Sequence, residues 1–392
     1  MVPRAPSKPA AATVRPEMRA YFDYNASSFP YPEVVEAMTR TLAEGAGNPS
    51  SMHGEGRRAR RSIEDARDQV AALLGTSSRR VLFTSGATEA NNTALRGFAA
   101  GSPASTIATT TIEHHSIVAT VTALEASGTR VVRVGVDRSG RPDLEALGRA
   151  SKAAPTLLSI AAANGESGHI IDLDAVRAVL APRTLLHVDA AQAVGRIPVL
   201  VADRIDLLSL SAHKFGGPTG VGALVIPEDL RWRSLLTGGP QERSIRAGTE
   251  NVAGIVGLGV AATISATRMK GEAERCRRLR DGLWQTLADR TDGLLRITPD
   301  DGLPNTLTIA VDRLGSDVIV AGLDLAGFAV STGSACAAGA PEPSHVMKAL
   351  GVEGRYASGV VRISMGHGTT DAAVVGLADA FVEVVGRARK AA

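Results

Sequence analysis

Two cysteines in a chain of 392 residues leave little room for cysteine-based architecture. Cys276 and Cys336 lie far apart in unlike contexts, which argues against a disulfide framework or a cysteine-built zinc site and favours a reducing compartment. The first 18 residues are rich in proline, alanine and basic residues but contain no apolar segment of the kind that a secretory signal needs. We interpret 1–18 as a disordered tail and expect a cytoplasmic protein; the arginines leave a transit peptide as the alternative.

Apolar runs of the ~18–20 residues that a membrane-crossing helix needs are also missing. Aromatic residues make up only 3% of the chain, so alanine, valine, leucine and isoleucine must build the core. The net charge of +3 comes from interspersed acids and bases, and the arginine cluster at 57–61 lacks the interleaved aromatics of a nucleic-acid groove. We therefore expect neither a membrane nor a nucleic acid as a partner.

Strand-like apolar runs alternate with helix-like segments between about residues 80 and 226. The expected strands are 81–84, 106–110, 131–136, 157–161, 185–188, 207–211 and 223–226, and the helical segments include 90–99, 116–126, 144–150 and 173–180. Nearly continuous apolar strands that alternate with helices are typical of a parallel sheet covered on both faces. The pattern predicts an α/β fold with a mostly parallel, seven-stranded sheet.

The pattern changes near residue 267. A charged helix is expected over 268–288, with leucines at helical spacing, and short strands are expected near 305–311 and 360–364. We therefore predict a large domain over 31–266 and a smaller α+β domain made from both chain ends, 19–30 and 267–392.

Lysine is scarce, and one of the six lysines stands in a distinctive place. Lys214 lies three residues beyond the end of the expected strand 207–211, at the strand's carboxyl end, where α/β folds place their ligands. A desolvated lysine loses its proton readily and can form a Schiff base with an aldehyde such as pyridoxal phosphate. The alternative is a lysine that buries its stem while its amine reaches solvent, and only the neighbouring motifs favour the first interpretation.

A turn of small residues, Ser85-Gly86-Ala87-Thr88, follows the first expected strand and precedes a helix. Such a turn is a candidate phosphate-binding site, because a phosphate can be held there by backbone N–H groups, the helix dipole and a hydroxyl from Ser85 or Thr88. It is not a Walker A loop, because the Gly-Lys-Ser/Thr ending is absent. An ordinary capped helix is the alternative.

Two further strand ends carry polar side chains. Asp189 can pair with a pyridinium nitrogen and Gln192 with the neighbouring ring oxygen, although an aspartate here can also be a helix N-cap. His114 can stack on a cofactor ring or can be a satisfied interfacial histidine. The adjacent histidines 114 and 115 lack the carboxylate or cysteine spacing of a metal site, so no metal is expected.

Cys336 lies among alanines, serines and glycines between Ser331 and Pro341. Such a setting indicates a mobile, exposed loop, where thiolate chemistry occurs. Cys276 lies in charged, helix-like sequence and is interpreted as a packed structural residue. Its neighbouring arginines can lower its pKa, so it stays as the alternative reactive thiol.

A set of motifs in one order resembles the NifS/IscS-like cysteine desulfurases, which are pyridoxal-phosphate enzymes of the class V aminotransferase group. The motifs are Phe22-Asp23-Tyr24-Asn25-Ala26, Gly47-Asn48-Pro49-Ser50-Ser51-Met52-His53, Phe83-Thr84-Ser85-Gly86-Ala87-Thr88-Glu89, Asp189-Ala190-Ala191-Gln192, Ser211-Ala212-His213-Lys214, Arg246-Ala247-Gly248-Thr249, and Ser334-Ala335-Cys336 followed by Glu342-Pro343-Ser344-His345. The similarity runs from about residue 21 to the end. It implies fold type I, a homodimer and conversion of L-cysteine to L-alanine.

The resemblance also implies a role for each matching residue. Lys214 would hold pyridoxal phosphate and act as the catalytic base, and Cys336 would accept the sulfur. The other implied contacts are catalytic His114 stacked on the ring, Asp189 at the pyridine nitrogen, Gln192 at the ring oxygen, Asn164 at the cofactor, Ala87, Thr88, Ser211 and His213 at the phosphate, Thr249 from the partner subunit, and Arg362 and Asn48 at the substrate. The implied partner is a sulfur-acceptor protein, either an iron–sulfur scaffold or a thiolation enzyme.

One departure concerns Asn164-Gly165-Glu166, where the family usually has two successive asparagines. The second asparagine normally contacts the cofactor or substrate, so this contact is either supplied by Asn164 or lost. The alternatives are a selenocysteine lyase or other class V enzyme, and a cofactor-binding scaffold or regulator without turnover. Alanine release from cysteine separates enzyme from scaffold, and a comparison with selenocysteine separates the two enzymes.

Overall fold

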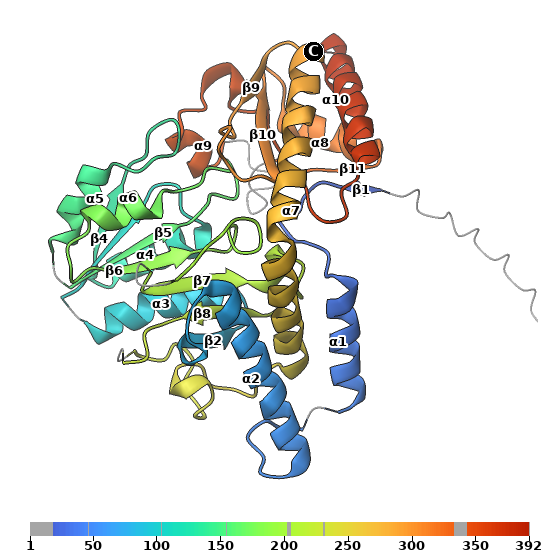
Figure 1. Ribbon diagram of the computed structural model, residues 1–392. Coiled ribbons are helices and arrows are strands. Elements are labelled where there is room, and N and C mark those ends of the chain that lie inside the picture. Colours follow the sequence, from blue (N-terminus) through green and yellow to red (C-terminus); the bar gives the residue numbers. More distant parts are fainter. Residues whose placement is uncertain are drawn as a thin grey trace, which may run out of the picture.

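The computed structural model describes residues 19–45, 47–102, 104–153, 155–201, 205–229, 232–332 and 343–391 (Figure 1). Its main sheet has seven strands in the order β2-β8-β7-β6-β5-β3-β4. These strands are β2 (Val81–Thr84), β3 (Thr106–Thr110), β4 (Arg130–Val134), β5 (Thr156–Ala161), β6 (Leu185–Asp189), β7 (Leu207–Ser211) and β8 (Gly222–Val225). Neighbouring strands from β7 to β4 are parallel, whereas β8 is antiparallel to β7 and β2. The predicted mostly parallel sheet is confirmed.

Helices cover both faces of this sheet. They are α1 (Pro32–Ala43), α2 (Gly54–Leu74), α3 (Ala87–Gly101), α4 (His115–Ala126), α5 (Leu144–Ser151), α6 (Leu173–Val179) and α7 (Val252–Arg290). Strand side chains alternate between faces: Leu82 packs in the apolar cluster that contains α3 and α4, whereas Val81 and Phe83 pack in the cluster that contains α2, α5, α6 and the first half of α7. This two-sided burial explains why the strands are almost uniformly apolar.

Two crossover helices begin at aspartates that the sequence places just before them. The side chains of Asp143 and Asp172 accept hydrogen bonds from the backbone N–H groups of Ala146 and Ala175, each at 2.9 Å. These N-caps satisfy N–H groups that have no partner within the helix. They fix where α5 and α6 start after their strands.

Helix α7 begins 16 residues earlier than the predicted start at residue 268. The added half is rich in glycine, which disfavours a helix by propensity. A side chain at Gly257 would come within 2.8 Å of Met38 in α1, and one at Gly259 within 2.2 Å of Gln69 in α2. The glycines therefore allow three helices to pack closely, and this packing overrides propensity.

Among the described residues, α7 is the one helix long and apolar enough to cross a membrane. However, 56% of its apolar window is buried inside the protein, where it packs on α1 and α2. We interpret this half of α7 as a core helix.

A second layer lies beyond the main sheet (Figure 1). It contains an antiparallel sheet in the order β12-β10-β9 and a parallel pair, β1-β11. Its elements are β1 (Ala20–Tyr21), α8 (Ser316–Leu325), β9 (Leu294–Arg296), β10 (Thr306–Val311), β11 (Phe328–Ala329), α9 (His345–Ala349), β12 (Val360–Ser364) and α10 (Asp371–Ala391). The second half of α7 packs with α8 and α10 in a separate apolar cluster. The strands expected near 305–311 and 360–364 are confirmed, and the division into two domains stays a prediction.

Candidate active site

A cavity of about 510 Å³ lies at the carboxyl ends of β5, β6 and β7, where ligands bind in α/β sheets. It brings together ten residues that the sequence singled out: Ala87, Thr88, His114, Asn164, Asp189, Gln192, Ser211, His213, Lys214 and Arg362. These residues come from the N-termini of α3 and α4, from the ends of β6 and β7, from the turns after β5, β6 and β7, and from β12 of the second layer. The fold therefore assembles one site from segments that are distant in sequence.

Lys214 ends the short 3-10 helix Ala212–Lys214, which directly follows β7. Its Nζ donates to the carbonyl oxygens of Asn25 (2.7 Å) and Ala26 (3.0 Å) and does not extend into solvent. Burial, then the positive charges of Arg196 and Arg362, lowers the pKa of Lys214 to about 8. A substantial fraction of the amine is therefore neutral near physiological pH, as a nucleophilic lysine requires.

Asp189 is the last residue of β6 and is buried. Its Oδ2 accepts from Asn91 Nδ2 (2.8 Å), and its Oδ1 accepts from the backbone N–H of Ala191 (3.0 Å). Turns follow this aspartate, so it is not the N-cap of a helix. Two donors fix the carboxylate as an acceptor facing the cavity.

His114 is the N-cap of α4. Its Nδ1 accepts from the backbone N–H of Ser116 at 3.1 Å. Burial lowers the pKa of His114, even though the nearby Asp189 acts in the opposite direction. The ring is therefore neutral at physiological pH.

The predicted phosphate turn is at the start of α3, whose first N–H groups lack partners within the helix. Gly86 has φ 154° and ψ 179°, a conformation that is essentially restricted to glycine. The hydroxyl of Ser211 lies 3.4 Å from the place where a Cβ on Gly86 would be. Burial, then the charges of Lys214 and Arg196, lowers the pKa of His213 to about 4. One part of the cavity is therefore surrounded by the small residues of the turn, the hydroxyl of Ser211 and the neutral imidazole of His213.

Gln192 is held by a residue that sequence reasoning missed. Arg196 donates through Nη1 to Gln192 Oε1, and through Nη2 to the carbonyl oxygens of Tyr24 (2.9 Å) and Lys214 (3.1 Å). Gln192 Nε2 donates to the carbonyl oxygen of Asn25 at 3.1 Å. Within the described part of the chain, the buried Arg196 has no carboxylate partner. No motif pointed to it, because only the fold brings these carbonyls together.

Asn164 lines the cavity, but its side chain is committed to a turn. Its Oδ1 accepts from the backbone N–H groups of Glu166 (2.9 Å) and Ser167 (2.8 Å), and its Nδ2 donates to a backbone carbonyl at 2.8 Å. A Cβ at Gly165 would lie 2.7 Å from the amide nitrogen of Gln192. Gln192 therefore occupies the space in which a second asparagine would begin, and a cofactor contact by Asn164 stays a prediction.

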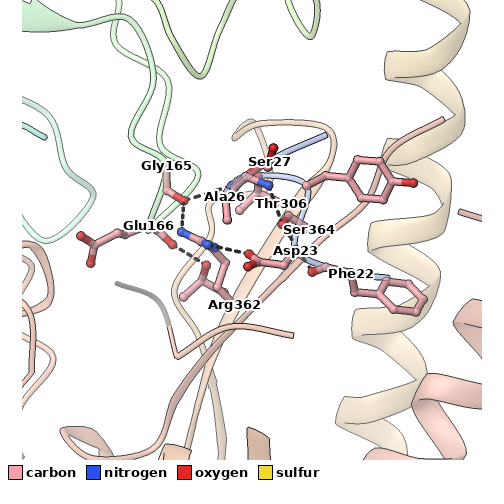
Figure 2. Close-up of polar contacts among 12 residues, drawn as sticks. Phe22, Asp23, Ala26, Ser27, Gly165, Glu166, Thr306, Arg362 and Ser364 are labelled. Atoms are coloured by element: carbon pink, nitrogen blue, oxygen red, sulfur yellow. Dashed lines mark hydrogen bonds and ion pairs between the residues drawn. The ribbon is translucent and has the colours of Figure 1, made fainter. Parts of the chain in front are cut away.

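Arg362, in β12, is buried beside the N-terminal segment (Figure 2). Its Nη2 donates to Asp23 Oδ1 at 2.8 Å, and its Nη1 donates to the carbonyl oxygen of Gly165 at 3.2 Å. The ion pair holds a planar, bidentate donor at the cavity wall, and this geometry suits a carboxylate ligand.

Two predicted residues, Thr249 and Asn48, do not line this cavity within one chain, and a third, Cys336, is not described. Thr249 and Asn48 are exposed, and the Asn48 side chain accepts from the backbone N–H of Ser50 at 2.9 Å. Cys336 lies outside the residues that the structure describes. The roles inferred for these three residues stay predictions.

Cys276 lies in α7 and is only 4% exposed. Burial raises the pKa of its thiol to about 11, although Arg275 acts in the opposite direction. It packs in the apolar cluster of the second layer, as expected of a structural cysteine. Inert buried thiols of this kind do not supply thiolate chemistry.

One further lining residue, Glu113, carried no clear signal in the sequence, and neither did Asn91 and Ser116, which contact the lining residues Asp189 and His114. Glu113 is 1% exposed, and burial raises its pKa to about 8, so it is a neutral acid near pH 7. Asn91 and Ser116 were recognised only as parts of sequence segments. Their roles depend on contacts between α3, α4 and β6.

These residues fit pyridoxal phosphate. A lysine with a lowered pKa, a carboxylate held by two N–H donors, and a helix N-terminus with small residues surround one cavity. They match the needs of the aldehyde, the pyridinium nitrogen and the phosphate. With the mostly parallel sheet, they define a pyridoxal-phosphate enzyme of fold type I.

Comparison with known proteins gives the family. The aminotransferase class-V profile matches residues 20–377. A cysteine desulfurase of Cereibacter sphaeroides is 43% identical over 95% of this chain and 97% of its own length. A solved NifS-like protein has a TM-score of 0.89 at 36% identity, covering 94% of this chain and all of that one (100%). The structure of SspA in complex with cysteine has a TM-score of 0.77 at 30% identity, covering 88% and 98% of the two chains.

The chain belongs to the class V aminotransferase family. Its similarity to cysteine desulfurases over most of its length supports cysteine desulfurase function, with pyridoxal phosphate as the cofactor. The resemblance inferred from the motifs is confirmed. The comparisons favour neither a selenocysteine lyase nor a scaffold without turnover.

Proposed function

We propose that this enzyme converts L-cysteine to L-alanine and transfers the sulfur to Cys336 as a persulfide. The observation that carries the proposal is that Lys214, Asp189 and Arg362 surround one cavity, with the pKa of Lys214 lowered to about 8. A structural relative, SspA, has been solved in complex with cysteine, which supports cysteine as the substrate.

Each side of the cavity has a role toward the cofactor. Lys214 holds it covalently, Asp189 pairs with its ring nitrogen, and Gln192 contacts the ring oxygen. The remaining proposed contacts are His114 on the ring face, Asn164 near the ring, Ala87, Thr88, Ser211 and His213 at the phosphate, and Thr249 from a second subunit. When bound, pyridoxal phosphate supplies an electrophilic aldehyde carbon and an electron sink.

The chain's own groups bind and deprotonate the substrate. Arg362 clamps the substrate carboxylate, with Asn48 as a further substrate contact, and the freed amine of Lys214 takes the α-proton. The thiolate of Cys336 then attacks the substrate sulfur. A sulfur–sulfur bond forms as the substrate carbon–sulfur bond breaks, and the three-carbon product takes up a proton and leaves as alanine.

Cys336 is proposed as the acceptor because both flanks of segment 333–342 are anchored at the cavity. On one side, Ser331 exchanges two backbone hydrogen bonds with Arg362 (3.1 and 2.8 Å). On the other side, Ser344 Oγ donates to Glu166 Oε2 at 2.6 Å. Arg362 and Glu166 both line the cavity, so the chain leaves and returns beside the site.

The wider setting is also part of the proposal. The enzyme acts in the cytoplasm as a homodimer, consistent with the exposure of Thr249 and Asn48, which do not reach the cavity of their own chain. The persulfide passes to an acceptor protein for iron–sulfur cluster or other thio-cofactor synthesis.

The decisive test is to assay the purified holoenzyme for alanine and sulfide from cysteine in the presence of a reductant. Stoichiometric alanine and sulfide support the proposal. A protein that binds the cofactor but releases no alanine contradicts it and points to a scaffold. Faster turnover of selenocysteine with little cysteine turnover points to a lyase.

A further inference from the structure

Buried hydrogen bonds connect the two residues proposed to flank the cofactor ring. Asn91, on α3, donates through Nδ2 to Asp189 Oδ2 (2.8 Å) and to Ser116 Oγ (2.9 Å). Ser116 Oγ in turn lies 2.8 Å from His114 Nδ1. Asn91 is fully buried and Ser116 is 8% exposed, so solvent competes little for these bonds. A continuous relay therefore joins the end of β6 to the start of α4.

The chemistry of the groups fixes the direction of each bond. The opposite amide orientation would place the Asn91 oxygen against the Asp189 carboxylate, so Nδ2 must face it. Ser116 Oγ accepts from Asn91, which leaves its single proton for His114 Nδ1. The backbone N–H of Ser116 points at the same nitrogen from 3.1 Å. An Nδ1 that receives these donors carries no proton, so the neutral ring holds its proton on Nε2.

We propose that Asn91 and Ser116 are positioning residues that hold the neutral tautomer of His114 with its proton on Nε2 and link it to Asp189. His114 then acts as a hydrogen-bond donor at Nε2 and not as a base. This inference rests on the roles proposed above for Asp189 and His114. The tautomer, however, is a property of the relay itself and can be measured independently of turnover.

The surroundings of His114 support a neutral ring. The charged or titratable groups that influence it are Asp189, Lys214, His115 and Glu166. Lys214 and His115 oppose protonation, as burial does, whereas the two carboxyl groups favour it; burial is the largest of these effects. The relay opposes protonation of His114 in the same direction as burial, because a donor directed at Nδ1 must be lost or turned before that nitrogen can take a proton.

The test is ¹⁵N NMR of histidine-labelled holoenzyme titrated with acid, with the His114 signal assigned from His114→Gln. Ser116→Ala removes the hydroxyl donor, and Asn91→Leu removes the amide that orients it. Thr120→Val is the matched control, since the Thr120 hydroxyl donates to Asn92 between the same two helices at 2.9 Å but stands outside the relay. The holoenzyme and the cofactor-free protein are compared.

The parent protein should show the Nε2-protonated tautomer. Ser116→Ala and Asn91→Leu should raise the His114 titration midpoint by roughly 0.5–1 pH unit, the size expected for one lost hydrogen bond. Thr120→Val should leave the midpoint unchanged. A proton on Nδ1 in the parent, or a midpoint that Ser116→Ala does not move, overturns the inference. If the shifts occur but cysteine is not turned over, the relay stands and the proposed function fails.

Discussion

The guanidinium of Arg196 donates a hydrogen bond to the main-chain carbonyl oxygen of Lys214, at 3.1 Å. A buried cation without a carboxylate partner in the described structure therefore lies beside the residue proposed to hold the cofactor. Its charge disfavours a second positive charge on the lysine. The same guanidinium holds Gln192 Oε1, which directs the amide nitrogen of Gln192 toward the site.

Arg196→Met should raise the Lys214 pKa from about 8 toward the ordinary lysine value, by roughly one unit, because a nearby like charge is lost. The neutral amine then predominates only at higher pH. The pH dependence of cofactor capture by the cofactor-free protein measures this midpoint. Arg196→Lys keeps the charge and should stay close to the parent. An unchanged midpoint in Arg196→Met would show that the charge of Arg196 does not contribute to the lowered pKa of Lys214.

Lys214→Ala should abolish alanine release, because the cofactor attachment point and the α-proton base are removed together. In the parent, borohydride reduction should link the cofactor covalently to Lys214, as located by peptide mass spectrometry. Lys270→Ala, at an exposed site on α7, is the control and should behave like the parent. Mapping of the cofactor to any other lysine contradicts the assignment.

Asp189→Asn should fold and retain a hydrogen bond from Ala191 but lose the negative charge opposite the ring nitrogen. We expect turnover to fall by at least about a hundredfold, as for loss of a preorganised electrostatic contact. Steady-state alanine release measures this change, and far-ultraviolet circular dichroism checks the fold. Near-parental turnover would mean that Asp189 serves only to order the turn.

Arg362→Lys keeps the positive charge but loses the planar fork that pairs with Asp23. The KM for cysteine should rise about ten- to hundredfold because bidentate carboxylate recognition is lost. The visible absorbance of the bound cofactor should persist, since Arg362 is not assigned to it. A parental KM would move the substrate-carboxylate site elsewhere.

The sequence was sufficient for the sheet because β6 and β7 are short apolar strands followed by recognisable polar turns. It was insufficient for α7, whose glycines lower helix propensity and are accepted only because α1 and α2 approach them closely. Lys214 and Asp189 were found because both lie at the carboxyl ends of apolar strands.

Arg196, Asn91 and Ser116 were not assigned because their function depends on tertiary partners. Arg196 binds carbonyls from the N-terminal segment and from the turn after β7. Asn91 bridges two elements that local patterning does not relate. Polar residues of this kind look like ordinary helix or turn residues until the fold is known.

The most direct test of the account is to locate the persulfide after reaction with cysteine, in the parent, in Cys336→Ser and in Cys276→Ser. Serine is a far poorer nucleophile toward sulfur, so Cys336→Ser should bind the cofactor but form no persulfide and lose cysteine-dependent alanine release. Cys276→Ser should match the parent, because its thiol is buried and its pKa is raised to about 11. The account predicts a persulfide on Cys336; a persulfide on Cys276, or full desulfurase activity in Cys336→Ser, would contradict it.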